Sequence, residues 1–186
     1  MIDIHINIGS NSGHREVLIG RAVAAVASSF PGAQVRQSDI VETAPWGFDS
    51  PNPFLNVGMV VHLAHEAVGF GGSASGSVSD LVWSSSGIRA TARPYIALEV
   101  LRRLLAIQAE IDPSPHRDAS GGYIDRAIDI DLIAIDDWTV ELPDLILPHP
   151  RMHLRDFVLI PLRQLAPDWR HPIIGKTPAE MINDLK

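Results

Sequence analysis

The chain has 186 residues, of which 46% are hydrophobic and 20% charged, and its formal net charge at pH 7 is −7. This length suits one domain with a substantial apolar core, and the acidic balance argues against a nucleic-acid backbone as the partner. Because the chain has no cysteine, disulfides, thiol nucleophiles and thiolate metal sites are excluded.

Targeting signals and membrane spans are not expected. The first residues, Met1 to His5, carry no basic segment followed by a long apolar run, and no apolar run approaches the ~20 residues of a membrane span. We therefore expect a cytoplasmic protein without membrane or nucleic-acid partners, either a monomer or a weak homo-oligomer.

The first third of the chain alternates between strand and helix patterns. Apolar residues at every second position predict a strand over residues 2–8 with one buried face, and helical spacing predicts a helix over 15–30. Further strands are predicted over 35–42 and 54–63, with a proline-rich loop over 43–53 between them.

A glycine- and serine-rich segment follows. Residues 69–87 have the composition of a flexible loop or linker, and we interpret about 64–93 as an insert in a single domain that spans residues 1–186. Pro94 is placed to open a second helix that ends near Asp112, and residues 114–122 form a polar loop.

The last third carries the most distinctive strand. Residues 126–135 alternate and are rich in isoleucine, which predicts a strand, and residues 140–147 form an edge segment broken by Pro143. Helices are predicted over 152–165 and after Thr177. The β-α-β-β-α-β order predicts an α+β, ferredoxin-like antiparallel sheet with helices packed on one face, plus additional C-terminal helices.

Two carboxylates share one face of the acidic strand. Asp129 and Asp131 are two residues apart, so they lie about 7 Å from each other on one side, where they repel and are costly to bury. A divalent cation would offset both costs, and Mg²⁺ typically binds one or two carboxylates together with substrate phosphates. The alternatives are a solvated strand end or pairing with basic neighbours.

Several motifs, in this order along the chain, together resemble one family. They are Gly9-Ser10-Asn11, Glu42-Thr43-Ala44-Pro45-Trp46-Gly47, Phe54-Leu55-Asn56, Asp129-Ile130-Asp131-Leu132, and the run Pro148-His149-Pro150-Arg151-Met152 followed by Arg155 and Phe157-Val158-Leu159. The chain thereby resembles the 6-hydroxymethyl-7,8-dihydropterin pyrophosphokinase family of folate biosynthesis. The resemblance covers most of the chain except about residues 64–93.

The resemblance implies an ATP-dependent pyrophosphokinase. It would transfer pyrophosphate from ATP to the hydroxymethyl group of the pterin and release AMP, without a covalent enzyme intermediate. Such chemistry requires positioning and charge neutralisation more than reactive side chains. The implied catalytic residues are Asp129, Asp131, Arg126 and Arg155, with Asp129 and Asp131 as the ligands of two Mg²⁺ ions.

The same resemblance distributes the substrate contacts. A flat pterin with amide-like edges needs aromatic faces and a bidentate amide. The residues expected to bind it are Thr43, Ala44, Trp46, Phe54, Asn56, Tyr123 and Phe157. The residues expected to bind ATP are Gln108, Arg117, Arg126, Ile130, His149 and Arg155.

Other interpretations stay open at this point. Arg126 could form a structural salt bridge, Arg155 could be a helix surface charge, Phe157 could be a core residue, and His149 could pair with His153 as zinc ligands. The loop over 112–122 lacks the family's Gly-Arg pair, and Gln108 stands where the family has a glutamate. A catalytically impaired relative that acts as a binding module, or a ferredoxin-like metal-dependent phosphohydrolase, would also fit such a chain.

Overall fold

The computed structural model describes residues 1–64, 83–84 and 87–185, and its centre is an antiparallel sheet. The strand order is β2-β4-β1-β7, and β3 also pairs with β4. The bounds are β1 (Ile2–Ser10), β2 (Gln34–Gln37), β3 (Val41–Thr43), β4 (Phe54–Leu63) and β7 (Asp129–Ile135). The strand pairings thus confirm a mixed structure of helices and an antiparallel sheet.

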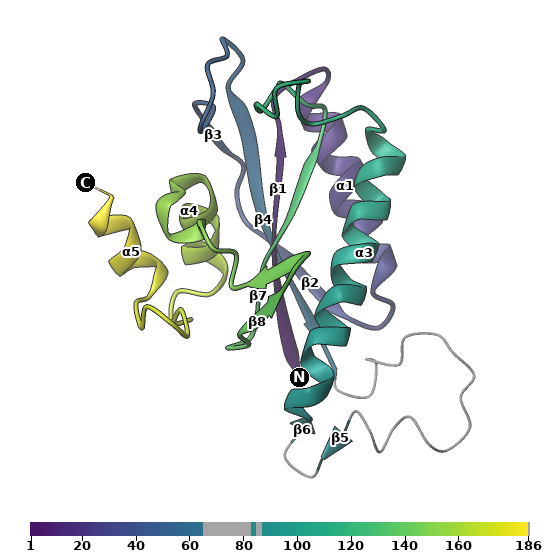
Figure 1. Ribbon diagram of the computed structural model, residues 1–186, viewed down its shortest axis with the longest axis vertical. Helices are drawn as coiled ribbons and strands as arrows, with labels where there is room; N and C mark the ends of the chain where they lie inside the picture. The colour runs from purple at the N-terminus through teal and green to yellow at the C-terminus, as the bar shows by residue number, and fades with distance from the viewer. Residues whose placement is uncertain (65–82, 85–86, 186) are drawn as a thin grey trace.

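Two long helices cover one face of this sheet (Figure 1). They are α1 (Arg15–Ser29) and α3 (Arg93–Ile111), the second preceded by the short helix η2 (Ala90–Ala92). Four isoleucines of β1 point toward these helices and are nearly inaccessible to solvent: Ile2, Ile4, Ile6 and Ile8. This face holds the main apolar core, as the alternating pattern predicted.

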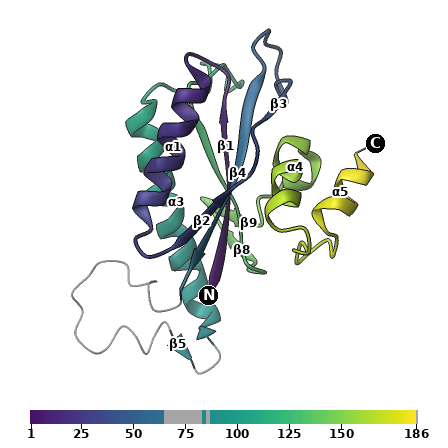
Figure 2. The same ribbon diagram turned by 180° about the vertical axis from the view of Figure 1, so that it is seen from behind.

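The C-terminal helices pack against the opposite face (Figures 1 and 2). These are η3 (Met152–Leu154), α4 (Asp156–Leu165) and α5 (Pro178–Asp184), the last capped by Thr177 and Glu180. A second apolar cluster forms there around Met152, Leu159 and Met181. The prediction that β1 has only one buried face is therefore wrong, because α4 also buries His5 and Asn7.

A β-bulge shifts the side-chain alternation of β7. Ile6 pairs with Leu132 whereas His5 pairs with Ala134, so Ile133 is an extra residue in β7. Ile133 stays on the side of the aspartates and joins the cluster under α4, whereas the bulge turns Ile135 into the main core. Strict alternation over residues 126–135 would place both Ile133 and Ile135 on the face of the aspartates; this expectation is wrong for Ile135, because a bulge reverses the alternation beyond it.

Three predicted elements are divided in the structure. The strand expected over 35–42 becomes β2 and β3, with the buried Ser38 hydroxyl accepting a hydrogen bond from Gly58 N at the break. The segment over 140–147 is a hairpin of β8 (Val140–Leu142) and β9 (Leu145–Leu147). The helix expected over 152–165 is interrupted at Arg155, whose backbone is extended.

Most of the predicted insert at about 64–93 lies outside the described residues. Within this range the structure describes two short strands, β5 (Trp83–Ser84) and β6 (Gly87–Ile88), and the residues that follow them. Leu63, before the insert, pairs with Ile2, whereas Asn56 pairs with Gly9 at the other end of β1. The insert therefore leaves β4 at the end of the sheet opposite Asn56. No helix among the described residues is long and apolar enough to cross a membrane.

Gly58 of β4 lets α4 approach the sheet closely. A Cβ atom added at this position would lie 2.7 Å from Cβ of Pro161, closer than real carbon atoms approach. We expect Gly58→Ala to lower the free energy of unfolding by about 1–3 kcal/mol, because the helix must move outward.

The matched control is Gly20→Ala in α1, where an added Cβ meets no atom within 4 Å. This substitution should be neutral or stabilise by up to about 1 kcal/mol, since glycine is unfavourable within helices. Urea denaturation of both variants measures the difference. Equal effects from the two substitutions would contradict the close packing of β4 on α4.

Candidate active site

A cavity of about 340 Å³ lies on the same face of the sheet as α4, over the part of that face that α4 does not cover. Side chains from β1, β4 and β7 form its floor, and three loop segments form its walls. Its lining contains these predicted site residues: Thr43, Ala44, Trp46, Phe54, Asn56, Arg117, Tyr123, Arg126, Asp129, Asp131, His149, Arg155 and Phe157. Residues far apart in the sequence thus meet in one cavity.

The antiparallel register places the acid pair on the cavity floor. Asp129 pairs with Gly9 and Asp131 pairs with Asn7, while Gly9 also pairs with Asn56 on the other side of β1. A Cβ atom at Gly9 would lie 3.0 Å from Oδ1 of Asn56. The lack of a side chain at Gly9 therefore leaves room for Asn56 on the same floor as the aspartates.

Each aspartate has its own arginine. Nη2 of Arg126 donates to Oδ2 of Asp129 over 2.7 Å, and Nη1 of Arg155 donates to Oδ2 of Asp131 over 3.4 Å. Both guanidinium groups are largely buried, and in both of them Nε has no hydrogen-bond partner. Each guanidinium group thus has one buried N–H group without a hydrogen-bond acceptor in this structure.

The two carboxyl groups differ in their affinity for a proton. Burial and the charge of Asp129 raise the pKa of Asp131 to about 7, although Arg155 opposes the shift. Burial also favours the protonated form of Asp129, but His116 and Arg126 outweigh it and lower its pKa below the ordinary value. Below about pH 7 the pair therefore carries close to one negative charge, and Asp131 loses its proton as the pH rises through that value.

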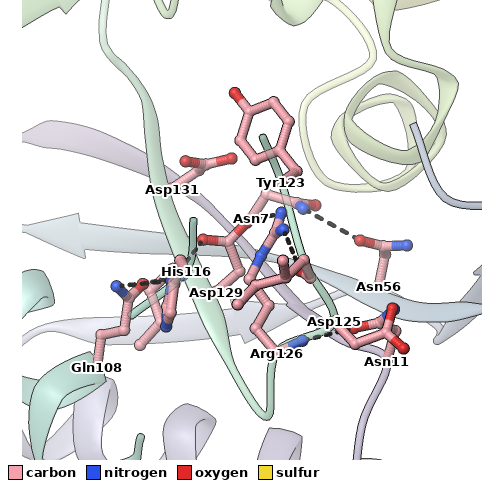
Figure 3. Close-up of polar contacts among 12 residues, drawn as sticks. Asn7, Asn11, Asn56, Gln108, His116, Tyr123, Asp125, Arg126, Asp129 and Asp131 are labelled. Atoms are coloured by element: carbon pink, nitrogen blue, oxygen red, sulfur yellow. Dashed lines mark hydrogen bonds and ion pairs between the residues drawn. The ribbon is translucent and has the colours of Figure 1, made fainter. Parts of the chain in front are cut away.

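Asn11, a motif residue without a predicted role, joins the segments around Arg126. The Asn11 side chain accepts a hydrogen bond from Arg126 N over 2.9 Å and donates to Asp125 over 2.6 Å. Asn52, on the loop over 43–53, also donates to Asp125, over 2.5 Å. Figure 3 shows Asn11, Asp125 and Arg126 beside the acid pair. The Gly-Ser-Asn motif thus contributes a hydrogen bond that holds the backbone of Arg126.

The far side of the cavity is aromatic and amide-rich. Asn56 donates from Nδ2 to the hydroxyl of Thr43 over 3.0 Å, and its Oδ1 accepts from Asn7 over 3.5 Å. Phe54 and Phe157 line the same cavity. A ring that stacks on these aromatic residues could hydrogen-bond the Asn56 amide at its edge.

A second cavity of about 340 Å³ shares Asp129, Asp131 and His149 with the first. Its walls are mainly apolar residues of α3, β7 and the β8–β9 hairpin, including Leu101, Leu105, Ile130, Leu132, Leu145 and Ile146. Gln108 and Ile130, which the first cavity does not include, lie here and are joined by a hydrogen bond of 2.7 Å from Ile130 N to Oε1 of Gln108. The acid pair therefore stands where two cavities meet.

His149 borders both cavities and is neutral in the structure. Burial lowers its pKa to about 4, and the charges of Arg155 and Arg151 act in the same direction. Nδ1 accepts a hydrogen bond from Arg151 N over 3.2 Å, so Nε2 carries the proton and is the donor. The ring is thus oriented as a neutral hydrogen-bond donor.

The alternative of a zinc site at His149 and His153 is not supported. Among the residues that the structure describes, no three His, Asp or Glu side chains are grouped as metal ligands. His153 lies instead against the ring of His171, 6.5 Å away between centroids.

The first cavity also contains lining residues that the sequence did not indicate, namely Asn7, Gly9, Phe48, His116 and Arg151. Asn7 could have been found by its place on the strand face of His5, since both are polar residues opposite an apolar face.

Comparison with known families identifies the class. Residues 89–167 match the 7,8-dihydro-6-hydroxymethylpterin-pyrophosphokinase (HPPK) family. A 2-amino-4-hydroxy-6-hydroxymethyldihydropteridine pyrophosphokinase of Porphyromonas gingivalis is 34% identical over 173 residues, covering 92% of this chain and 95% of the relative. The Bacillus subtilis enzyme of the same name is 27% identical over 87% of this chain and 77% of its own length. The chain belongs to this family.

Solved structures support the same fold. An HPPK-DHPS protein in complex with substrates matches with a TM-score of 0.58 at 12% identity, over 98% of this chain and 43% of that one. The Plasmodium falciparum HPPK-DHPS with SDX-DHP gives a TM-score of 0.57 at 13% identity, over 98% and 44%. This chain thus spans less than half the length of those proteins, and the likeness concerns their fold.

The raised pKa of Asp131 predicts a pH-dependent cost to stability in the metal-free protein. The folded protein holds this proton up to about pH 7, whereas an unfolded chain releases it near pH 4, so stability falls as the pH rises between these values. We expect Asp131→Asn to be more stable than the parent at about pH 8, by about 1–2 kcal/mol given the partial exposure of the carboxyl, and the gain to vanish near pH 4.

Urea denaturation in the presence of a chelator, at several pH values, measures this difference. Asp168→Asn serves as the control, because Asp168 is an exposed aspartate outside both cavities. A gain for Asp131→Asn that does not change with pH would show that the carboxyl is ionised throughout.

Proposed function

We propose that this chain transfers pyrophosphate from ATP to the hydroxymethyl oxygen of 6-hydroxymethyl-7,8-dihydropterin and releases AMP, a reaction of folate biosynthesis. One observation carries the proposal: two cavities of different character meet at Asp129 and Asp131. A transfer between two substrates requires both to reach one point, and catalysis then comes from positioning and charge stabilisation. We also infer that the strand order β2-β4-β1-β7 is the ferredoxin-like arrangement of a single domain.

The pterin belongs in the aromatic cavity. Phe54, Phe157 and Trp46 offer ring faces, and Asn56 offers an amide whose donor and acceptor match a pterin edge. Thr43 fixes the Asn56 amide by accepting a hydrogen bond from it. Specificity for the pterin then comes from shape and from the Asn56 amide, with Ala44 and Tyr123 completing the walls.

The nucleotide belongs in the second cavity. Its apolar walls, which include Ile130 and Leu145, suit an adenine base, and Gln108 lies at its border. The triphosphate would run from there toward the acid pair, past the Nε2–H of His149. Arg126, Arg155 and Arg117 would then contact the phosphates, and their place in the lining of the adjoining first cavity supports this role.

The acid pair fits a site for Mg²⁺ that the substrates complete. Asp129 and Asp131 offer oxygen ligands on one strand face, and burial of the pair raises the pKa of Asp131 to about 7, a cost that a divalent cation would remove. We propose two Mg²⁺ ions here, which when bound neutralise phosphate charge and lower the pKa of the substrate hydroxyl. The chain's own residues hold the hydroxymethyl oxygen and the phosphate in line.

A direct assay tests the proposal. AMP release from ATP should require 6-hydroxymethyl-7,8-dihydropterin, and Asp129→Ala or Asp131→Ala should lower turnover by at least about a hundredfold at saturating Mg²⁺. Asp168→Ala, which removes an exposed carboxylate elsewhere, should leave turnover unchanged. Phosphate release without pterin would favour a phosphohydrolase, and the absence of any reaction would favour a binding module.

The arginines also predict an order of binding. Without substrates, Arg126 lies over the Phe54 ring at 5.0 Å, and Arg155 lies over the Phe157 ring at 5.5 Å. Phosphate oxygens bind guanidinium groups more strongly than aromatic faces do, so bound nucleotide should draw both arginines away and free the rings for the pterin.

We therefore expect a non-hydrolysable ATP analogue with Mg²⁺ to strengthen pterin binding by at least about tenfold. Calorimetric titration of pterin with and without the analogue measures this coupling. Adenosine alone is the control, because it lacks the phosphates and should produce no gain. Equal pterin affinity in all three titrations would refute the exchange of arginine partners.

A further inference from the structure

Arg151 lies between two loops at the mouth of the aromatic cavity. Its Nη2 donates to the Tyr123 hydroxyl over 2.8 Å, and its Cζ lies 5.4 Å from the centre of the Trp46 ring. Trp46 belongs to the proline-rich loop after β3, and Tyr123 belongs to the loop before β7. One guanidinium group therefore contacts both loops from a third segment.

These contacts continue on both sides of Arg151. Arg155 lies 4.8 Å from the centre of the Trp46 ring, on the side of Asp131. On the other side, Arg126 lies 5.4 Å from the Tyr123 ring and 5.0 Å from the Phe54 ring. Alternating arginine and aromatic side chains thus run around the cavity, and Arg151 closes the row at its outer edge.

Tyr123 is held firmly enough to serve as an anchor for Arg151. Its backbone forms a β-bridge with Arg117, whose Cζ lies 4.2 Å from the Tyr123 ring centre. The backbone of Arg151 is also anchored, since its N–H donates to Nδ1 of His149. Arg151 therefore connects the Pro148–Pro150 segment to both loops, with its backbone held by His149 and its side chain in contact with Trp46 and Tyr123.

We propose that Arg151 is a positioning residue that holds Trp46 and Tyr123 together as the outer wall of the pterin site. The inference rests on the proposed function for the identity of the substrate. Arg151 itself need not touch the reacting phosphates. It sets the affinity for the pterin by fixing the wall, and it leaves the transfer step to residues on the cavity floor.

The planar guanidinium is essential to this role. Arginine can stack on one aromatic ring while one of its N–H groups donates sideways to a hydroxyl. Lysine carries the same charge but has a compact ammonium group, which cannot do both in a fixed geometry. Charge and geometry can therefore be separated by comparing the two residues at this position.

Steady-state kinetics of Arg151→Ala and Arg151→Lys give the first test. Both variants should raise KM for the pterin by about tenfold while kcat stays within about threefold, because binding is lost equally in the ground state and the transition state. KM for ATP should stay within about twofold. Recovery in Arg151→Lys, or a larger rise in KM for ATP than for the pterin, would overturn the proposal in favour of a phosphate contact.

Hydrogen exchange gives a second test that does not depend on activity. In Arg151→Ala, backbone amides of residues 44–50 and 117–124 should exchange faster, because the two loops lose their connection. Arg163→Ala removes an exposed arginine of α4 outside the cavity and should leave both segments unchanged. Unchanged exchange in Arg151→Ala would overturn the proposal even if the pterin assay succeeds.

Tyr123→Phe removes only the hydroxyl and completes a double-mutant cycle. If the hydrogen bond between Arg151 and Tyr123 carries part of the effect, the double variant should raise KM for the pterin less than the product of the two single effects. A rise in KM for the double variant equal to the product of the two single effects would show that Arg151 and Tyr123 act independently, and would contradict a role for their hydrogen bond. A parent protein without pterin-dependent AMP release would refute the proposed function, whereas the exchange experiment would still test the connection between the loops.

Discussion

The site depends on the electrostatic cost of placing two carboxylates side by side in a partly buried cavity. Asp129 and Asp131 repel each other on one strand face, and neither can be ionised there without a positive partner. Arg126 pairs with Asp129 and Arg155 pairs with Asp131, and each arginine is held in place by a different part of the structure. Asn11 fixes the backbone of Arg126, whereas Arg155 is held at the break between η3 and α4.

The same sheet face supports both the second apolar cluster and the proposed active site. Gly58 lets α4 lie directly on β4, and Gly9 leaves space beside Asn56. The two glycines lie on the central strands β4 and β1, so the helix covers one part of the face and the cavity occupies the rest. The β-bulge at Ile133 lies next to this division: Ile133 stays on the face of the aspartates and packs under α4, whereas Ile135 turns to the main core on the opposite face.

The arginines combine two kinds of interaction. A guanidinium group is weakly hydrated and planar, so it can stack on an aromatic ring and also donate to an anion. In this protein Arg126 contacts both the Phe54 ring and Asp129. The first cavity is therefore lined by aromatic rings and guanidinium groups that contact each other in this structure, and these are the side-chain types that suit a flat ring and phosphate groups.

The sequence alone indicated much of the fold and most of the residues that line the two cavities. Strict alternation in residues 2–8 and 54–63 predicted β1 and β4, since a period of two leaves little choice of face. Asp129 and Asp131 could be assigned to one face for the same reason. The family motifs then selected aromatic and basic residues, and these line the two cavities.

Only the tertiary structure decided how these parts combine. No local pattern shows that α4 would cover the second face of β1, or that Ile133 would be an extra residue in β7, because both depend on which strand lies opposite. No local pattern assigns a role to Asn11 or Arg151 either, because their hydrogen-bond partners are 114 and 28 residues away along the chain. Periodicity and motifs determine what each segment can do by itself, whereas contacts between distant loops arise from the folded packing.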